Sequence, residues 1–312
     1  MIGREPELEP EPGGGPASAP DPALVFAAHR PLLFTIAYEI TGSAADAEDV
    51  VQDSWLRWAE VDPGAVRSPR AYLAQIVTRQ ALNRLRSAAR RREEYVGPWL
   101  PEPLLTAPDV ADDVVLAESV SMAMMVVLET LTPDERAVFV LREVFGFSHD
   151  EIAAAIGRNA PAVRQIAHRA RSHVRARRPV AGAAASPETG EAILHQFLTA
   201  TSTGDLQGLM DLLAPDVVLI TDGGGIRQAA LRPILGADKT ARFLIGVMSG
   251  LGGAEVLIES VRVNGEPGSV VRIGDVTDTV GSVAVVDGRI AAIHLVRNPD
   301  KLRTLVQRPL TR

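Results

Sequence analysis

Apolar side chains recur at helical spacing in the N-terminal part of the chain. The clearest stripe advances in steps of 3, 1, 3 and 4, which places its members on one face of an amphipathic helix: Ala47, Val50, Val51, Ser54 and Trp58. Ser43 precedes it as a helix cap, Asp21-Pro22 opens an earlier helix, and Ser68-Pro69 opens a later one. Pro31 should kink or restart the first of these helices. The pattern predicts an all-α unit over residues 21–95.

Helical periodicity returns after residue 120. Two patterns each predict the start of a helix. Thr132 is a cap followed by Pro133 and two acids in the first turn, and Ser148 with Glu151 forms a capping-box pattern. Gly157 ends the short second helix, and another helix begins near Asn159. The apolar positions of this last helix again advance in steps of 3, 1, 3 and 4: Val163, Ile166, Ala167, Ala170 and Val174. Two helices joined by a short glycine-containing turn form a helix-turn-helix, so we predict a second all-α unit over residues 121–178.

From about residue 188 the pattern mixes helix and strand. Two amphipathic helices and a strand come first, and a helix follows over roughly 238–249. Four stretches rich in β-branched residues, separated by turn residues, complete the chain. This order predicts an α+β cone over residues 188–312, with two or three helices packed against a curved sheet of about five strands.

Three stretches without such periodicity lie before and between these units. Residues 1–20 are rich in Glu, Pro and Gly, which predicts a disordered tail. Residues 96–120 carry acids and prolines but no Lys or Arg, which predicts an extended acidic linker. Residues 179–187 form a second linker. The predicted fold class is therefore multi-domain, with two all-α domains followed by the α+β cone.

Composition narrows the class of protein. None of the 312 residues is cysteine, which excludes disulfides and thiolate metal sites and fits a reducing cytoplasm. No uninterrupted apolar run approaches the ~18 residues that cross a bilayer, and the N-terminus lacks the order of a signal peptide. We therefore expect a cytoplasmic protein that does not associate with membranes.

Charge is distributed unevenly, although the chain has a formal net charge of −7. The segment "GRNAPAVRQIAHRARSHVRARR" (157–178) contains many arginines and no acid. Arginines along the exposed face of the second helix of a helix-turn-helix are suited to bind phosphates and guanine edges in a major groove. The predicted DNA-binding residues here are Arg158, Arg164, Gln165, His168, Arg169, Arg171 and Arg175.

Two longer motifs resemble a known family. "DAEDVVQDSWLRW" (46–58), followed by "SPRAYLAQIVTRQALNRLRS" (68–87), resembles region 2 of the sigma-70 superfamily, and "LTPDERAVFVLREVFGFSHDEIAAAIGRNAPAVRQIAHRARSHVR" (131–175) resembles region 4. The presence of these two regions without a middle domain is typical of extracytoplasmic-function (ECF) sigma factors. The chain departs from the usual region 2 pattern at Tyr72, Arg79 and Asn83, where the family often has Trp, Asn and Asp. Its base preference therefore cannot be carried over.

The resemblance implies partners and contact residues. Bacterial RNA polymerase core, through its β′ clamp and β flap, and promoter DNA are the implied partners. The implied clamp-binding residues are Asp46, Glu48, Asp49, Gln52, Asp53 and Arg57. The residues implied in melting and binding the −10 element follow the loop 59–68, and they are Arg70, Tyr72, Arg79, Asn83, Arg86 and Arg90.

The C-terminal cone resembles the SnoaL-like, NTF2-like superfamily, and three short motifs resemble those of the SigJ-type subgroup of sigma factors. These motifs are "WLPEP" (99–103), "DGGG" (222–225) and "NPDKL" (298–302). The resemblance implies that this domain regulates the sigma factor to which it is fused. Trp99 and Leu100 are large apolar groups in an acidic stretch, so we expect them to dock on the C-terminal domain. The predicted regulatory contacts are Trp99, Leu100, Pro101, Asp222, Gly223, Gly224, Gly225, Asn298, Pro299, Asp300, Lys301 and Leu302.

Two other classes of function stay open at this stage. One is a ligand-responsive helix-turn-helix regulator that acts without polymerase. The other is a small-molecule enzyme of the SnoaL-like superfamily, for which the candidate residues in the cone are Asp216, Asp222, His195 and His294. Fold alone does not supply an activity, so we predict no enzyme, no catalytic residue, no metal and no cofactor. A ligand of unknown identity in the cone is compatible with the resemblance.

Overall fold

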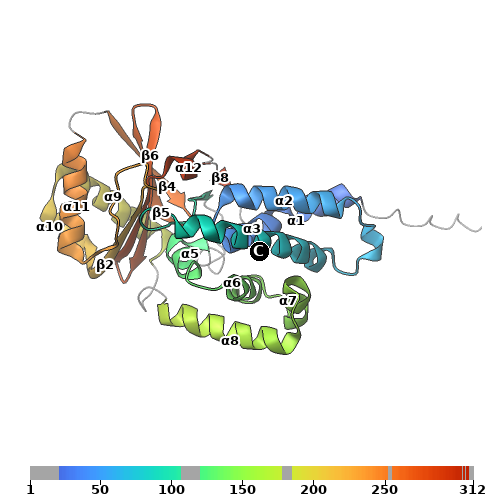
Figure 1. Ribbon diagram of the computed structural model, residues 1–312. Coiled ribbons are helices and arrows are strands. Elements are labelled where there is room, and N and C mark those ends of the chain that lie inside the picture. The colour runs from blue at the N-terminus through green and yellow to red at the C-terminus, as the bar shows by residue number, and fades with distance from the viewer. Residues whose placement is uncertain are drawn as a thin grey trace, which may run out of the picture.

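The computed structural model describes residues 21–106, 120–177, 185–251, 255–303, 305 and 307–308. The predicted tail (1–20) lies outside the described residues, as do most of the acidic linker (107–119) and part of the second linker (178–184). The described chain forms two helical units and a mixed domain built around a sheet (Figure 1). The predicted fold class is therefore correct.

The first helical unit contains three long helices. These are α1 (Pro22–Thr41), α2 (Ala44–Trp58) and α3 (Pro69–Glu93), with a short 3₁₀ turn, η1 (Pro63–Ala65), before α3. Ser43 caps α2, because its side chain accepts a hydrogen bond from the Asp46 N–H. The predicted apolar stripe of α2 is buried. The helix does not restart at Pro31, since α1 runs through this residue as one helix.

By length and composition α1 could cross a membrane, contrary to the expectation from the uninterrupted apolar runs. The structure gives its apolar character another role. Of the 18-residue stretch of α1 that is apolar enough to cross a membrane, 56% is buried inside the protein, where α1 packs against α2 and α3. Leu33, Ile36 and Ile40 are fully buried, as expected for the core helix of a helical unit.

The second helical unit contains α5 (Met122–Leu128), α6 (Pro133–Phe139), α7 (His149–Ile156) and α8 (Ala160–Arg177). A π-helical turn, η3 (Val140–Val144), extends α6. The capping box predicted at Ser148 is formed, and Thr132, predicted as a cap, also forms a capping box with Glu135. Gly157 ends α7 in the left-handed conformation, with φ 69°, and all five residues of the predicted apolar stripe of α8 are buried. The helix-turn-helix is therefore present as predicted.

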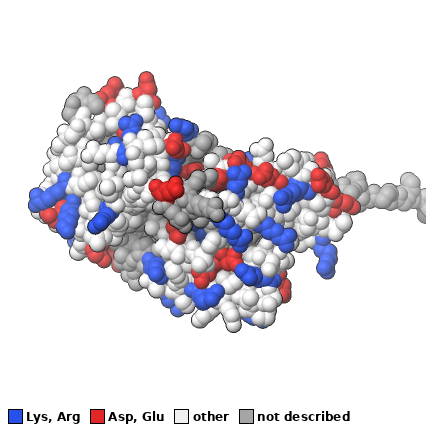
Figure 2. Space-filling view, in the orientation of Figure 1, with Lys and Arg blue, Asp and Glu red and all other residues white. Residues whose placement is uncertain are grey.

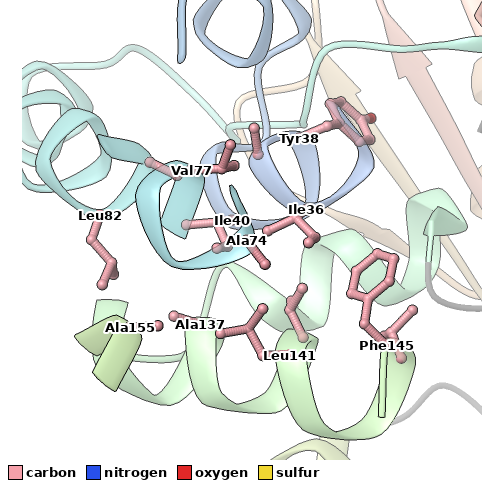
Figure 3. Packing of buried hydrophobic residues seen from close by; sticks show 14 of the residues in the cluster. Ile36, Tyr38, Ile40, Ala74, Val77, Leu82, Ala137, Leu141, Phe145 and Ala155 are labelled. Atoms are coloured by element: carbon pink, nitrogen blue, oxygen red, sulfur yellow. The ribbon is translucent and has the colours of Figure 1, made fainter. Parts of the chain in front are cut away.

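The two helical units share one hydrophobic core. Residues of α1 and α3 face residues of α6, η3 and α7 across it, and Figure 3 shows Ile36 and Ala74 on one side with Ala137 and Leu141 on the other. The buried Arg136 joins the units as well, since its Nε donates to the Glu39 carbonyl oxygen of α1 at 2.6 Å. The two units therefore form one packed body in this structure, although the sequence predicts them as separate units.

The C-terminal domain is built around one sheet. Its helices are α9 (Pro187–Thr203), α10 (Leu206–Leu212), α11 (Ala237–Gly250) and α12 (Pro299–Leu302). Its strands are β2 (Leu213–Asp222), β3 (Ile234–Leu235), β4 (Val256–Val263), β5 (Glu266–Ile273), β6 (Val276–Val286), β7 (Arg289–Val296) and β8 (Gln307–Arg308). The order in the sheet is β3-β2-β7-β6-β5-β4-β1-β8. Strand β1 (Leu105–Thr106) comes from the linker and pairs antiparallel with β4 through Leu105 and Val263.

The two faces of the sheet bury different elements. On one face α9, α10 and α11 pack over a core that contains Leu219, Val283 and Ile293. The opposite face packs against the linker residue Leu100, the α5 residue Met122 and Leu302 of α12. Figure 1 shows α9, α10 and α11 on one side of the sheet and the helical units on the other. The outer face of the sheet is therefore an interface within the chain.

Removal of the Arg136 side chain should destabilise the joined helical units. Arg136 is 1% exposed and its Nη1 lies 2.6 Å from the Glu129 carboxylate, so Arg136→Ala removes a buried cation from that carboxylate and a donor from the Glu39 carbonyl oxygen. We expect a loss of about 3–5 kcal/mol in the free energy of unfolding. Chemical denaturation followed by tryptophan fluorescence measures it. The exposed Arg175→Ala is the control, with an expected change within about 0.5 kcal/mol; an equal effect of the two variants would contradict the prediction.

Candidate nucleic-acid interface and linker-docking site

The linker lies extended between the first helical unit and the C-terminal domain, with its backbone donors satisfied. Pro101 and Pro103 have no N–H, so the donors of residues 100–104 belong to Leu100, Glu102 and Leu104. Leu100 N–H donates to Asp222 Oδ2 and Leu104 N–H to Asn264 Oδ1, each at 2.9 Å. Glu102 N–H donates to the Gly42 carbonyl oxygen at 2.9 Å. Partners therefore alternate between the C-terminal domain and the first helical unit.

A buried ion pair holds the start of the linker. Lys301 Nζ lies 2.7 Å from Asp222 Oδ2, and the two side chains are 4% and 0% exposed. The same ammonium donates to the Leu100 carbonyl oxygen and lies 3.3 Å from the centroid of the Trp99 ring. This site brings together one residue from "DGGG", one from "NPDKL" and two from "WLPEP". The predicted docking residues therefore lie in contact.

Tyr95 completes the site, and the sequence analysis did not identify it. Its hydroxyl donates to Asp222 Oδ1 at 2.5 Å and accepts from Asn298 Nδ2 at 2.8 Å. Its ring packs edge-on against Trp99, with centroids 4.7 Å apart. Burial, followed by the hydrogen bond to the Asp222 carboxylate, raises the pKa of Tyr95. A neutral hydroxyl is therefore available to donate to Asp222.

The glycines of "DGGG" allow the chain segments to approach closely. Gly224 has φ 62°, and a Cβ at this position would clash with the Asn298 amide. Gly225 has φ 73°, and its Cβ would lie 3.1 Å from Val96 Cβ. Both positions therefore require glycine, for conformation and for space. Pro101 and Leu302 are buried at the same interface, whereas Asp300 is 58% exposed and pairs with Arg303 at 3.1 Å.

Glu102 attaches the linker to the first helical unit. Its carboxylate accepts from Ser43 Oγ and from the Ala44 N–H, each at 2.8 Å, at the N-terminus of α2. Its carbonyl oxygen accepts from the Tyr38 hydroxyl at 2.7 Å. A carboxylate at a helix N-terminus is favoured by the unpaired N–H groups and the helix dipole. The "WLPEP" motif therefore binds the C-terminal domain through its first residues and α2 through Glu102.

The predicted DNA-binding residues of α8 and of the turn before it lie at the protein surface. Those described as exposed are Arg158, Arg164, Gln165, His168, Arg169, Arg171 and Arg175. Acids of the same unit pair with three of the arginines, Arg158 with Asp134 at 3.0 Å, Arg171 with Glu143 at 3.2 Å and Arg169 with Glu135 at 3.7 Å. Figure 2 shows acidic and basic residues side by side on this half of the molecule. Exposed pairs of this kind contribute about 0–1 kcal/mol each, so DNA phosphates can replace the acids.

The predicted DNA-binding residues of α3 lie against the second helical unit. Arg79 donates to the carbonyl oxygens of Ala154 at 2.7 Å and Ala155 at 3.2 Å, both in α7. Arg70 donates to the Phe145 carbonyl oxygen at 3.1 Å, and its guanidinium carbon lies 4.4 Å from the centroid of the Phe147 ring. Arg86 pairs with Asp134 at 2.9 Å. Tyr72 and Asn83 are exposed. Arg90 lies near the end of α3, outside the described side chains.

A surface cavity of about 320 Å³ lies beside Tyr72. The loop before α3 forms one side of it, through Val66 and Ser68, and α7 contributes Glu151 and Ala154. The loop that the family resemblance assigns to capture of an unstacked base is thus partly walled by the second helical unit. We call this relative placement of α7 on α3 the closed arrangement.

The predicted polymerase-binding face of α2 points away from that contact. Arg84 of α3 lies near three of its acids, Asp46 at 3.7 Å, Asp49 at 3.3 Å and Asp53 at 3.8 Å. Glu48 pairs with Arg30 at 2.7 Å. Gln52, Asp53 and Arg57 are exposed, and Figure 1 shows α2 on the opposite side of the helical units from α7 and α8. The face is therefore accessible in the closed arrangement.

The enzyme candidates do not form one site. His195 and Asp216 are exposed, whereas Asp222 is ion-paired beneath the linker. His294 pairs in register with Ile220 of β2 and Ser282 of β6, so it lies on the outer face of the sheet, not among the helices of the cone. Burial lowers the pKa of His294 to about 4, which makes it a neutral core residue. Among the described residues, no group of three or more His, Cys, Asp or Glu side chains could hold a metal ion.

Comparisons with known proteins agree with this architecture. The family models for sigma-70 region 2 and sigma-70 region 4 match residues 25–91 and 121–174. The chain is 40% identical to the ECF RNA polymerase sigma factor SigJ of Mycobacterium tuberculosis, over 88% of this chain and 91% of that protein. It is 31% identical to the probable ECF RNA polymerase sigma factor SigI of the same organism, over 91% of this chain and 95% of that protein.

The two helical units, the helix-turn-helix and the sheet domain thus define a sigma-type transcription factor with a fused α+β domain. The crystal structure of Mycobacterium tuberculosis SigJ covers 93% of this chain and 100% of that chain, with a TM-score of 0.73 and 35% identity. The chain belongs to the ECF RNA polymerase sigma factors, with regions 2 and 4 and a SnoaL-like C-terminal domain. We refer to the two helical units below as region 2 and region 4.

Neutralisation of Lys301 should release the linker from the C-terminal domain. Lys301→Met keeps most of the apolar stem but leaves the Asp222 carboxylate buried without its cation, which costs about 3–5 kcal/mol. We expect faster amide hydrogen exchange across residues 95–106, measured by mass spectrometry on the full-length protein.

Lys239→Met is the matched control, because Lys239 is exposed on α11, on the far face of the sheet. Unchanged exchange in Lys301→Met, or an equal increase in the control, would mean that the ion pair does not hold the linker.

Proposed function

We propose that α8 of region 4 binds the −35 promoter element and that α3 of region 2, with the loop before it, melts and binds the −10 element. The exposed arginine face of α8 supports the first assignment. Because the apolar face of α8 is buried, Arg164, His168 and Arg171 on the opposite face point into solvent. The cavity beside Tyr72 supports the second, because an unstacked base needs a pocket next to an aromatic ring.

The acidic face of α2 is the proposed contact with the β′ clamp of RNA polymerase core. Asp49 and Asp53 are 56% and 49% exposed, and their neighbour Arg84 lies on the side of α2 that faces α3. An acidic, exposed helix face suits a basic partner surface and steers its approach. The β flap is the proposed partner of region 4. Because polymerase and promoter are the partners, the protein acts in the cytoplasm.

The C-terminal domain is proposed to regulate the sigma factor through the linker. The observation that carries this proposal is the closed arrangement, in which Arg70 and Arg79 bind backbone groups of region 4. These residues can contact DNA only when α7 moves away from α3. The C-terminal domain binds the linker between the two regions through Asp222 and Lys301, so it controls how far they can separate.

A regulator that binds operators without polymerase is the alternative from another class. It predicts sequence-specific DNA binding by the free protein and no association with core polymerase. The exposed acidic face of α2 favours the sigma factor, because a DNA-binding regulator has no need of a second, acidic docking surface. Co-purification with core polymerase separates the two functions.

Substitution of Arg164 tests −35 recognition. We expect Arg164→Ala to weaken promoter binding by holoenzyme by about 1–3 kcal/mol and to relax preference at one base position. Arg177→Ala, at the end of the same helix, should weaken binding to all sequences alike. Binding is measured on a set of promoter variants with single base changes in the −35 element. Wild-type affinity and preference in Arg164→Ala would remove this residue from the interface.

Charge reversal on α2 tests the polymerase contact. The double variant Asp49→Lys, Asp53→Lys should lose co-purification with core polymerase while keeping its helical circular dichroism, because both side chains are exposed. A double variant at exposed acids of the C-terminal domain, Asp211→Lys with Asp216→Lys, has the same change in charge and should bind core normally. Core binding by a folded α2 variant at the control level would contradict the assignment.

A further inference from the structure

One hairpin of the C-terminal domain contacts both DNA-binding regions and the linker. It connects β4 to β5 through Asn264 and Gly265, which have φ 54° and 77°. An Asn-Gly pair with both φ values positive is the favoured two-residue turn between antiparallel strands. Such turns normally point into solvent. Asn264, however, is 0% exposed.

Among the described residues, the hydrogen-bond partners of the Asn264 side chain all lie outside the C-terminal domain. Nδ2 donates to the Tyr38 hydroxyl of α1 at 2.7 Å and to the carbonyl oxygen of Val120, the last linker residue before region 4, at 2.8 Å. Oδ1 accepts from the Leu104 N–H of the linker at 2.9 Å. One buried amide thus joins region 2 to two points of the linker that connects it with region 4, at ordinary hydrogen-bond distances.

The backbone of the hairpin adds to the same contact. Asn264 N–H donates to the Leu104 carbonyl oxygen at 2.8 Å, and Gly265 N–H donates to Thr106 Oγ1 at 3.0 Å. Val263 pairs with Leu105 in the strand that the linker adds to the sheet. The amide therefore lies at a rigid point of the interface, where a buried polar group left without partners is costly.

From these contacts we infer that Asn264 is a positioning residue for promoter binding: it fixes regions 2 and 4 in the closed arrangement through Tyr38, Leu104 and Val120. This inference rests on the proposed function, because it assumes that the closed arrangement covers the DNA-binding residues of α3. None of the three subgroup motifs contains Asn264. Loss of its bonds favours separation of the regions and so exposes α3.

The chain offers a matched pair of substitutions. Asn264→Gly keeps a residue that adopts positive φ, so it removes the amide bonds and leaves the turn intact. Asp287, in the β6–β7 hairpin, has φ 50° and is also followed by glycine, but it is exposed. Asp287→Gly is therefore the same backbone change in the same type of turn, and it leaves the amide bonds to Tyr38, Leu104 and Val120 in place. Tyr38→Phe removes one partner of the amide from the other side of the interface.

The distance between regions is the first measurement. Because the chain has no cysteine, spin labels can be attached to Leu56→Cys on α2 and Ser172→Cys on α8, both exposed positions. We expect Asn264→Gly to shift the distance distribution of the full-length protein to longer values, with a change in the ratio of open to closed protein of roughly tenfold or more. Tyr38→Phe should shift it in the same direction, and Asp287→Gly should match the wild type.

Promoter binding by holoenzyme is the second measurement, and we expect it to increase in Asn264→Gly. Unchanged distances in both Asn264→Gly and Tyr38→Phe would overturn the inference, as would equal shifts in Asn264→Gly and Asp287→Gly. Longer distances without increased promoter binding would support the positioning role and contradict the proposed masking of α3. If Asn264→Gly does not fold, the distance distribution of Tyr38→Phe tests the inference: longer distances support it, and unchanged distances overturn it.

Discussion

The constraint on which this structure depends is that a peptide group taken out of water needs a hydrogen-bond partner. Residues 100–104 have only three backbone donors, because prolines occupy the positions between them. Region 2 supplies the Gly42 carbonyl oxygen as one acceptor, and the C-terminal domain supplies the other two, the Asp222 carboxylate and the Asn264 amide oxygen. The linker is therefore held at defined points, and its position fixes the segments on both sides of it.

The apolar contacts follow from that placement. With the linker held, α5 reaches the outer face of the sheet and α7 reaches α3, so regions 2 and 4 bury a common core. Hydrophobic burial supplies most of the free energy, but it does not by itself choose one relative orientation of two helical units. The polar contacts at Asp222, Glu102 and Asn264 have the directionality that the apolar core lacks. Stability and orientation thus come from different groups in the same interface.

Local pattern predicted the helices well and the interfaces poorly. The buried stripes of α2 and α8 match the structure because an amphipathic helix carries its own periodic signal. The helix does not restart at Pro31, because the buried core around α1 supports the helix on both sides of this residue. Strand β1 is two residues long and its partner lies far away in the sequence, so no local pattern marks it. Tyr95 and Asn264 escaped notice because a single tyrosine or a turn asparagine has meaning only through distant partners.

The outer face of the sheet has a consequence for the lifetime of any open form. Val263, Val270, Val280 and Val296 are each 1% exposed in this structure, because the linker and α5 cover them. Removal of that cover presents a contiguous apolar surface beside a sheet edge that has lost β1, and such edges pair readily with other chains. An opened molecule therefore persists in a crowded cell only if it closes again quickly or if another surface covers the sheet. Reclosure thus competes with self-association, and the balance between the two shifts with protein concentration.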